Sequence, residues 1–151
     1  MLEFPEEARM SFPPLEHEHA HAAYDPETRI ATITYRGNLN ADASAAAYEW
    51  LGNLTREIGT EQLYGEIFDF RQVTEFMPDN LMDARKQSRR FNLKTNVNFP
   101  VAMIVKDFYQ EEILRGPMQN VKENARKTIV KWVEEALAFM QEWHAQNPAG
   151  G

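Results

Sequence analysis

The stretch FDFRQVTEFMPDNL, at 68–81, joins a strand to the start of a helix. Its apolar first residues complete a segment that we predict as a buried strand over 63–70, with the carboxylate of Asp69 near its end. Its last residues include PDN at 78–80, and these residue types favour the opening turn of a helix. A strand that leads directly into a helix is the unit from which α/β sheets are built.

The sequence before this stretch predicts a hairpin and a helix. LEHEHAHAAY and RIATITYRG flank DPET at 25–28. Asp followed by Pro suits the start of a type I turn, so we expect two antiparallel strands here. Asn40 can cap the next helix, in which apolar residues recur at helical spacing, and Gly59 can end it.

The sequence after this stretch continues the alternation of helices and strands. FPVAMIV at 99–105 is a continuous apolar run of strand length, which is typical of a strand covered on both faces. The last segment, at 129–143, fits one helix or a strand followed by a helix, and we predict the second arrangement. The other predicted elements are a helix at 79–92, a helix capped by Asp107 and ended by Gly116-Pro117, a strand at 127–133 and a helix from Glu134.

These elements predict a single α/β domain. Alternating strands and helices imply a mixed sheet with parallel central strands, and we expect four to six strands with the helices packed mainly on one face. The length of 151 residues, with 43% hydrophobic residues, suits one compact core. We expect the domain over 15–145, an N-terminal arm at 1–14 and a flexible tail at 146–151.

The composition excludes several classes of function. A formal charge of −7 disfavours general attraction to nucleic acid or to an anionic membrane. Without cysteine there is no disulfide, thiol nucleophile or thiolate metal site. The start MLEFPEEARM lacks the basic and apolar regions of a signal peptide, and no apolar stretch has membrane-spanning length, so we expect a cytoplasmic protein.

Positive charge is concentrated around the predicted helix at 79–92. Its basic residues recur at spacings that place them on one side of a helix, and Asp79 can cap the start of that helix. This surface could receive an acidic partner or an anionic ligand, or it could be a solvated face with local pairs to Asp79 and Asp83. The candidate binding residues are Arg71, Asp79, Arg85, Lys86, Arg89 and Arg90.

HEHAH at 17–21 is the one metal-like spacing in the sequence. Alternate residues of a strand point the same way, so two imidazoles could share an ion, but no acid is expected on their face. We therefore predict an exposed ladder of histidines rather than a metal site. The expected partners across the hairpin are Thr32 for His21, Thr34 for His19 and Arg36 for His17.

No arrangement of residues indicates catalysis. The serines lie outside any nucleophile-elbow pattern, and the glycines form no phosphate-binding loop. A buried Asp69 satisfied by backbone N–H groups is a simpler role than acid–base chemistry. We therefore predict that the protein is not an enzyme and binds no cofactor. We expect Trp50, Trp132 and Trp143 in the core.

Two segments resemble the STAS domain, named for sulfate transporters and anti-sigma-factor antagonists, and especially its SpoIIAA-like branch. IFDFRQVTEFMPDNL is similar to the family strand that ends in an acid and a Val-Thr pair before a helix, and WVEEALAFMQEW is similar to its closing helix. The resemblance covers about 17–144. It implies the element order predicted above and a surface that binds a regulatory protein partner.

The resemblance also bears on regulation. Anti-sigma-factor antagonists carry Asp-Ser-Ser-Gly-Leu after this strand, and their second serine is phosphorylated by the partner kinase. With Val73-Thr74 as the anchor, that pentapeptide corresponds to MPDNL at 77–81, and Asp79 replaces the switch serine. The resemblance thus implies partner binding without a phosphoserine switch.

Two further expectations concern ligands and assembly. The SpoIIAA-like branch is similar in fold to lipid-binding CRAL-TRIO domains, so a carrier of a small hydrophobic or anionic ligand is the alternative function. A polar sheet face left without a helix could also support a homodimer. The residues that could line a ligand pocket are Met77, Met82, Phe91, Met103 and Met118.

Overall fold

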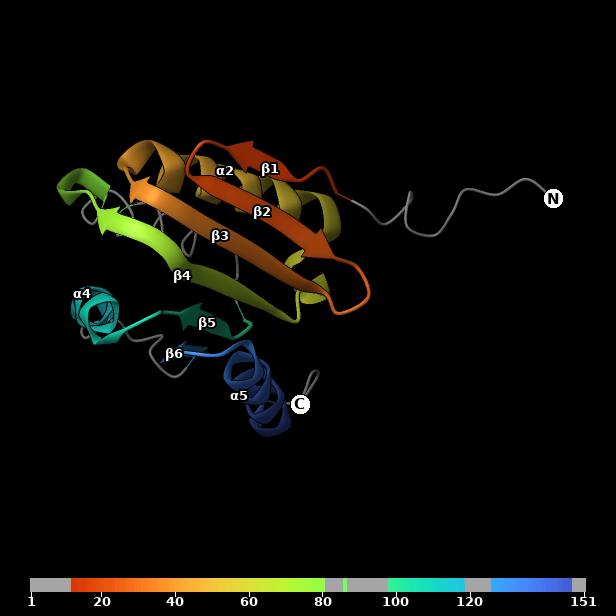
Figure 1. The fold of residues 1–151 in the computed structure, drawn as a ribbon. Helices are drawn as coiled ribbons and strands as arrows, with labels where there is room; N and C mark the ends of the chain where they lie inside the picture. Colours follow the sequence, from red (N-terminus) through yellow and green to blue (C-terminus); the bar gives the residue numbers. More distant parts are fainter. Residues whose placement is uncertain (1–11, 81–85, 87–97, 119–125, 148–151) are drawn as a thin grey trace.

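The computed structural model describes residues 12–80, 86, 98–118 and 126–147 (Figure 1). Its strands form one sheet in the order β1-β2-β3-β4-β5-β6, antiparallel from β1 to β3 and parallel from β3 to β6. The α/β class and the mixed sheet with parallel central strands are confirmed. The strands are β1 (Leu15–His17), β2 (Ala20–Asp25), β3 (Ile30–Leu39), β4 (Gly65–Phe76), β5 (Val101–Ile104) and β6 (Lys127–Val130).

The helix after β3 begins and ends at the capping residues that the sequence suggests. Asn40 Oδ1 accepts a hydrogen bond from the backbone N–H of Ala43, and Gly59 ends the same helix with a φ of +85°. No helix among the described residues is long and apolar enough to cross a membrane. The described helices include α2 (Ala41–Ile58), α4 (Phe108–Met118) and α5 (Val133–Gln146), and a 3-10 turn lies at Thr60–Gln62.

The larger apolar core lies between α2 and one face of the sheet. Ile33, Leu51 and Phe68 are buried together there, and Leu114 of α4 joins the same cluster. Burying the side chains of this cluster is the main favourable term in folding. Most helical packing is therefore on one face, as the sequence predicts.

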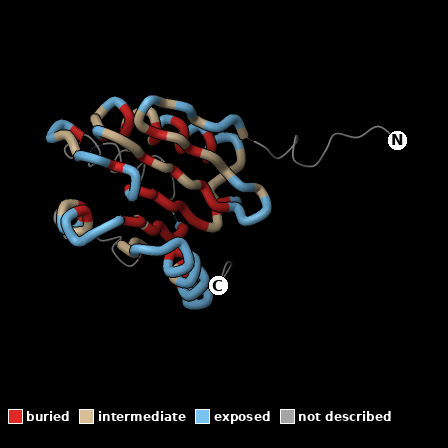
Figure 2. The backbone as a smooth tube through the Cα atoms, in the orientation of Figure 1, coloured by how far each residue is buried: buried red, intermediate tan, exposed pale blue. Residues whose placement is uncertain are grey.

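The opposite face is partly covered by α5. Ala136 and Met140 pack against Ile67 and Ala102. This approach is close, because a Cβ added at Gly65 would lie 2.5 Å from Met140 Sδ. The remainder of α5 is largely exposed (Figure 2). The expectation that this sheet face carries no helix is therefore wrong where α5 covers β5 and β6.

Strand β4 extends six residues beyond the predicted end, to Phe76. Two register shifts against β3 give it extra residues and bend it. Only Glu66 to Asp69 pair with β5. The part of β4 after Asp69 therefore has β3 as its one neighbouring strand among the described residues. Arg71 and Gln72 are exposed as a result, and a polar exposed segment does not resemble a buried strand in sequence.

The C-terminal elements match the predicted order. Strand β5 lies between β4 and β6, and the 127–133 region divides into β6 and the start of α5 rather than forming one helix. Helix α4 does not end at Gly116, since it continues through Pro117 to Met118.

The N-terminal hairpin differs from its predicted register by two residues. His21 lies opposite Thr34 and not Thr32. HEHAH is not one strand, because the chain turns at residues 18 and 19, so that His17 of β1 pairs with Ala20 of β2. His21 keeps its predicted face, since a shift of two preserves the alternation of side chains. His17 instead shares the face of its partner Ala20 and contacts Asp42 of α2, so the ladder of three histidines does not form.

Candidate functional site

The parallel strands end at a common edge of the sheet, which we call the carboxyl edge. It consists of the residues that directly follow Leu39, Phe76, Ile104 and Val130. The arrowheads of β3, β4 and β5 point toward it in Figure 1. Ligands of open α/β sheets bind outside the carboxyl ends of the strands, so this edge is a candidate binding site.

The turn after β4 is anchored from both sides at the carboxyl edge. The N–H of Met77 donates to Leu39 O at 2.9 Å. The hydroxyl of Ser44 on α2 donates to Asn80 Oδ1, and both side chains are buried. Between these anchors, Asp79 is exposed to solvent. The fold therefore presents Asp79 on a fixed turn.

Asp79 does not occupy the capping position that the sequence suggests. Helical residues begin at Pro78, so Met77 precedes the helix and Asp79 is its second residue. Proline is favoured at the first helical position because its missing N–H has no partner there in any case. A carboxylate within this first turn still interacts favourably with the helix dipole.

Arg71 is held by its neighbour Asp69 on the bent part of β4. Asp69 Oδ1 accepts from the backbone N–H and from Nε of Arg71, each at 3.0 Å, and Asp69 Oδ2 accepts from Nη2 at 2.8 Å. The hydrogen bonds that Arg71 donates to Asp69 raise the pKa of the Arg71 guanidinium. The buried Asp69 is thus satisfied by one backbone N–H, as expected, and also by Arg71, whose side chain remains 38% exposed.

Gln110 fastens α4 to the same part of β4. Its Nε2 donates to Phe70 O at 2.9 Å and to Val73 O at 3.3 Å, and its Oε1 accepts from the N–H of Lys106. The predicted cap is confirmed, since Asp107 Oδ1 accepts from the N–H of Gln110. Sequence reasoning missed this buried residue; a Gln three positions after a capping Asp was the available signal.

The predicted basic surface is described only in part. Arg71 is exposed within the second half of β4, and Asp79 and Lys86 are exposed beyond its carboxyl end. No hydrogen bond or ion pair within the described part of the chain joins these three residues to one another. The remaining members, Arg85, Arg89 and Arg90, lie outside the described residues, and so does Asp83, the alternative partner.

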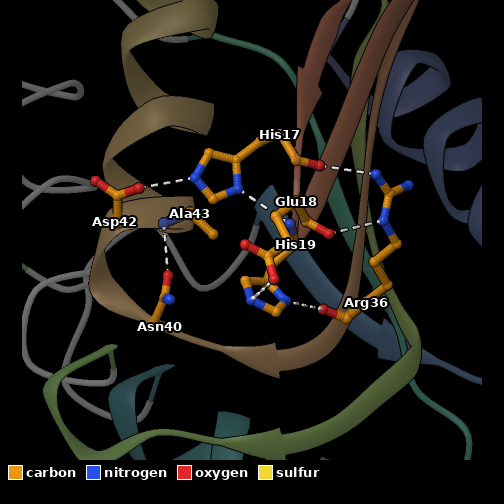
Figure 3. A network of polar contacts seen from close by, with 7 residues as sticks. All are labelled: His17, Glu18, His19, Arg36, Asn40, Asp42 and Ala43. Carbon is orange, nitrogen blue, oxygen red and sulfur yellow. Dashed lines mark hydrogen bonds and ion pairs between the residues drawn. The ribbon is translucent and has the colours of Figure 1, made fainter.

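A second polar network surrounds the turn between β1 and β2 (Figure 3). His17 Nε2 lies 2.8 Å from Asp42 Oδ2 on α2, and His17 Nδ1 accepts from the N–H of His19 at 3.0 Å. Arg36 donates from Nη2 to His17 O at 2.7 Å and from Nε to Glu18 O at 3.0 Å. Arg36 on β3 therefore binds the carbonyl groups of this turn.

Each histidine of the hairpin faces its own carboxylate. His21 Nδ1 lies 2.5 Å from Glu16 Oε1, and this hydrogen bond lowers the pKa of the Glu16 carboxyl. His19 Nε2 lies 3.6 Å from Glu18 Oε2. The expectation of no acid beside the histidines is wrong, because the turn brings β1 alongside β2. No group of three or more potential ligands that could hold a metal ion occurs among the described residues.

Glu66 is a buried acid that sequence reasoning did not select. It lies in β4 on the face covered by α2, and its Oε2 has no hydrogen-bond partner among the described atoms. Burial raises the pKa of its carboxyl to about 8, although the charges of Arg126 and Lys127 act in the opposite direction. The signal in the sequence is an acid at the start of a strand that is otherwise apolar.

The residues suggested for a ligand pocket do not gather in the described part of the chain. Met103 packs against the larger core, and Met77 lies at the carboxyl edge. Met82 and Phe91 fall outside the described residues, and for Met118 only the helical backbone is described.

Several large apolar side chains are exposed near the carboxyl edge. Phe108 and Tyr109 begin α4, and Trp132 is 61% exposed just before α5. The expectation that all three tryptophans are in the core is correct for Trp50 and Trp143 and wrong for Trp132. Trp132 follows β6 by two residues, beyond the area that the sheet can cover.

Comparison with known proteins concerns the fold. No protein-family model matches the chain, and no curated protein matches it in sequence. An uncharacterised protein of the DUF3478 family from Shewanella loihica PV-4, with a SpoIIAA-like fold, is similar to it with a TM-score of 0.56 at 15% identity. The match covers 83% of this chain and 98% of that chain. The fold implied by the sequence resemblance is confirmed: the chain has a SpoIIAA-like fold.

Proposed function

We propose that the protein is a non-enzymatic regulatory or scaffolding domain that binds another protein. Its binding surface is the turn after β4 together with the basic residues of the predicted helix at 79–92. We call this the 71–90 surface, and it consists of Arg71, Asp79, Arg85, Lys86, Arg89 and Arg90.

The exposure of Asp79 on an anchored turn is the observation that carries this proposal. Met77 is tied to β3 and Asn80 to α2, while Asp79 between them faces solvent. A turn held in one conformation loses little conformational entropy when a partner binds. This geometry and the SpoIIAA-like fold both support a preorganised docking site.

The same turn functions without phosphorylation at its central position. A phosphoserine carries about −1.5 to −2 charges and can be dephosphorylated, whereas the carboxylate of Asp79 carries one permanent charge. Partner binding is therefore constitutive with respect to kinases and phosphatases that act on this position.

Site-specific photocrosslinking tests the proposal. A photoreactive phenylalanine derivative replaces Asp79 in one version of the protein and Glu27 in a control, because Glu27 is exposed in the turn between β2 and β3. We expect one cellular protein to crosslink at position 79 and not at position 27, equally before and after phosphatase treatment. The same products from both positions would contradict the proposal. A small molecule retained through purification and seen by native mass spectrometry would support the ligand carrier instead.

A further inference from the structure

The turn between β1 and β2 is held by the pairing of His17 with Ala20, by Arg36 and by the imidazole of His17. The N–H of His19 donates to His17 Nδ1 at 3.0 Å, across two residues of the turn. The other ring nitrogen, Nε2, lies 2.8 Å from Asp42 Oδ2 on α2 (Figure 3). His17 thus links the turn internally and also connects it to the first turn of a helix.

These two contacts determine the protonation state of the ring. A nitrogen that accepts a hydrogen bond from a backbone N–H carries no proton of its own. His17 Nδ1 is therefore bare, and Nε2 carries the proton that is donated to the carboxylate of Asp42. The structure requires the neutral Nε2–H tautomer of His17.

The surroundings of His17 contain both signs of charge. Asp42 on α2 favours a positive ring. The Arg36 guanidinium, which donates to His17 O and Glu18 O from β3, disfavours it. The His19 ring has its centroid 6.2 Å away and directs Nδ1 at Arg36 O at 3.2 Å, so this Nδ1 carries a proton. The Glu18 carboxylate faces His19 rather than His17.

A second proton on His17 must enter at Nδ1. It would place an N–H donor against the N–H of His19, so the hydrogen bond would be lost and the two donors would repel. The attraction between the imidazolium and Asp42 compensates only a little for this loss, because the Asp42 side chain is 83% exposed and exposed ion pairs contribute little. A second proton at His17 Nδ1 and the hydrogen bond from the His19 N–H therefore exclude each other.

We propose that His17 is a proton-sensitive latch for the turn between β1 and β2. The neutral ring holds the His19 N–H, and the imidazolium releases it. Imidazoles gain their second proton in the range that cells use for pH signals.

This release is confined to the turn itself. At the other end of β1, the Trp50 indole N–H donates to Pro13 O at 2.8 Å, and Phe12 packs edge-on against the Trp50 ring. Neither contact contains a group that titrates near neutral pH. Acid thus frees the His19 N–H from His17, while Arg36 and Asp42 still hold the turn and the beginning of β1 stays attached.

Nuclear magnetic resonance tests the latch on the full chain. Long-range correlation of ring protons with ring nitrogens gives the tautomer of each histidine, and amide exchange gives the protection of the His19 N–H. At pH 8 we expect His17 as the Nε2–H tautomer with a protected His19 amide. At pH 5 we expect a doubly protonated His17 ring and loss of at least tenfold in that protection.

Two variants separate the latch from general acid effects. His17→Asn offers a side-chain oxygen to the same N–H at every pH, so its His19 amide should be equally protected at pH 8 and pH 5. Asp42→Asn keeps an acceptor for Nε2–H but removes the charge that favours imidazolium, so the release of the His19 N–H should move to a lower pH. Unchanged His19 protection between pH 8 and pH 5 in the unmodified protein, an Nδ1–H tautomer at pH 8, or the same release by acid in His17→Asn would overturn the proposal.

Discussion

Glu66 is an ionisable residue in a buried position, where its charged form is unfavourable. Its carboxyl is buried under α2, and burial raises the pKa to about 8 from a usual value of 4.5. The folded protein therefore holds a proton on Glu66 that the unfolded chain releases. Stability from this group is complete below pH 4.5 and is lost progressively as the pH rises toward 8.

Glu66→Gln is expected to stabilise the protein at neutral and alkaline pH. Glutamine has the shape of the protonated acid and does not titrate. Because one pKa unit corresponds to about 1.4 kcal/mol, the gain should reach a few kcal/mol at pH 8 and be small at pH 4.5. Urea unfolding of both proteins at these two pH values measures it. If the difference in unfolding free energy between the two proteins does not change with pH, Glu66 is ionised in the folded state.

Asn80 is the residue that anchors the proposed docking turn to the core. Asn80→Ala should cost about 1–3 kcal/mol in unfolding free energy, because it removes a buried partner of Ser44. Adding Ser44→Ala should cost less than the sum of the single changes, since the two side chains share one hydrogen bond. Chemical denaturation of the three variants gives the coupling, and strict additivity would contradict the contact.

The contact between α4 and β4 depends on Gln110. Gln110→Leu leaves Phe70 O and the N–H of Lys106 without this buried partner, which should cost about 1–3 kcal/mol. Gln146→Leu is the matched control, because that glutamine is exposed at the end of α5. Thermal unfolding compares the two. An equal, small effect of both changes would show that Gln110 does not join the two elements.

Elements with strong local signals are those that the sequence predicts correctly. Asn40 and Gly59 mark both ends of α2, Asp107 marks the start of α4, and the apolar run at 99–105 contains β5. Each of these signals lies within the element that it specifies or directly beside it. Local chemistry therefore suffices for them.

Elements whose limits depend on distant residues were predicted wrongly. In the observed register of β2 against β3, Arg36 binds the carbonyls of the β1–β2 turn, and no pattern within the hairpin reveals that contact. The length of β4 depends on β3 running beside it past the end of its pairing with β5. In the candidate site, Asp79 was predictable from the family resemblance, whereas the anchoring role of Asn80 requires α2 to be in place.

At the scale of the whole molecule, part of one sheet face has no described helix over it. His21, Thr32 and Thr34 are half-buried on this face, beside the half covered by α5. We expect a homodimer through this face, with a mass by light scattering of twice 17.5 kDa at micromolar concentration. Thr32→Arg with Thr34→Arg should give the mass of one chain. A single-chain mass for the unmodified protein would refute the dimer.

Charge reversal on the 71–90 surface shows whether a partner docks there. Arg85→Glu with Arg89→Glu is compared with Arg29→Glu and Arg56→Glu, which make the same charge change at exposed positions outside that surface. The yield of the protein that crosslinks at position 79 is measured for each by quantitative mass spectrometry. We predict that the first pair abolishes capture and that the second leaves it unchanged, with both variants folded by circular dichroism. Undiminished capture by the first pair would show that this surface is not the docking site.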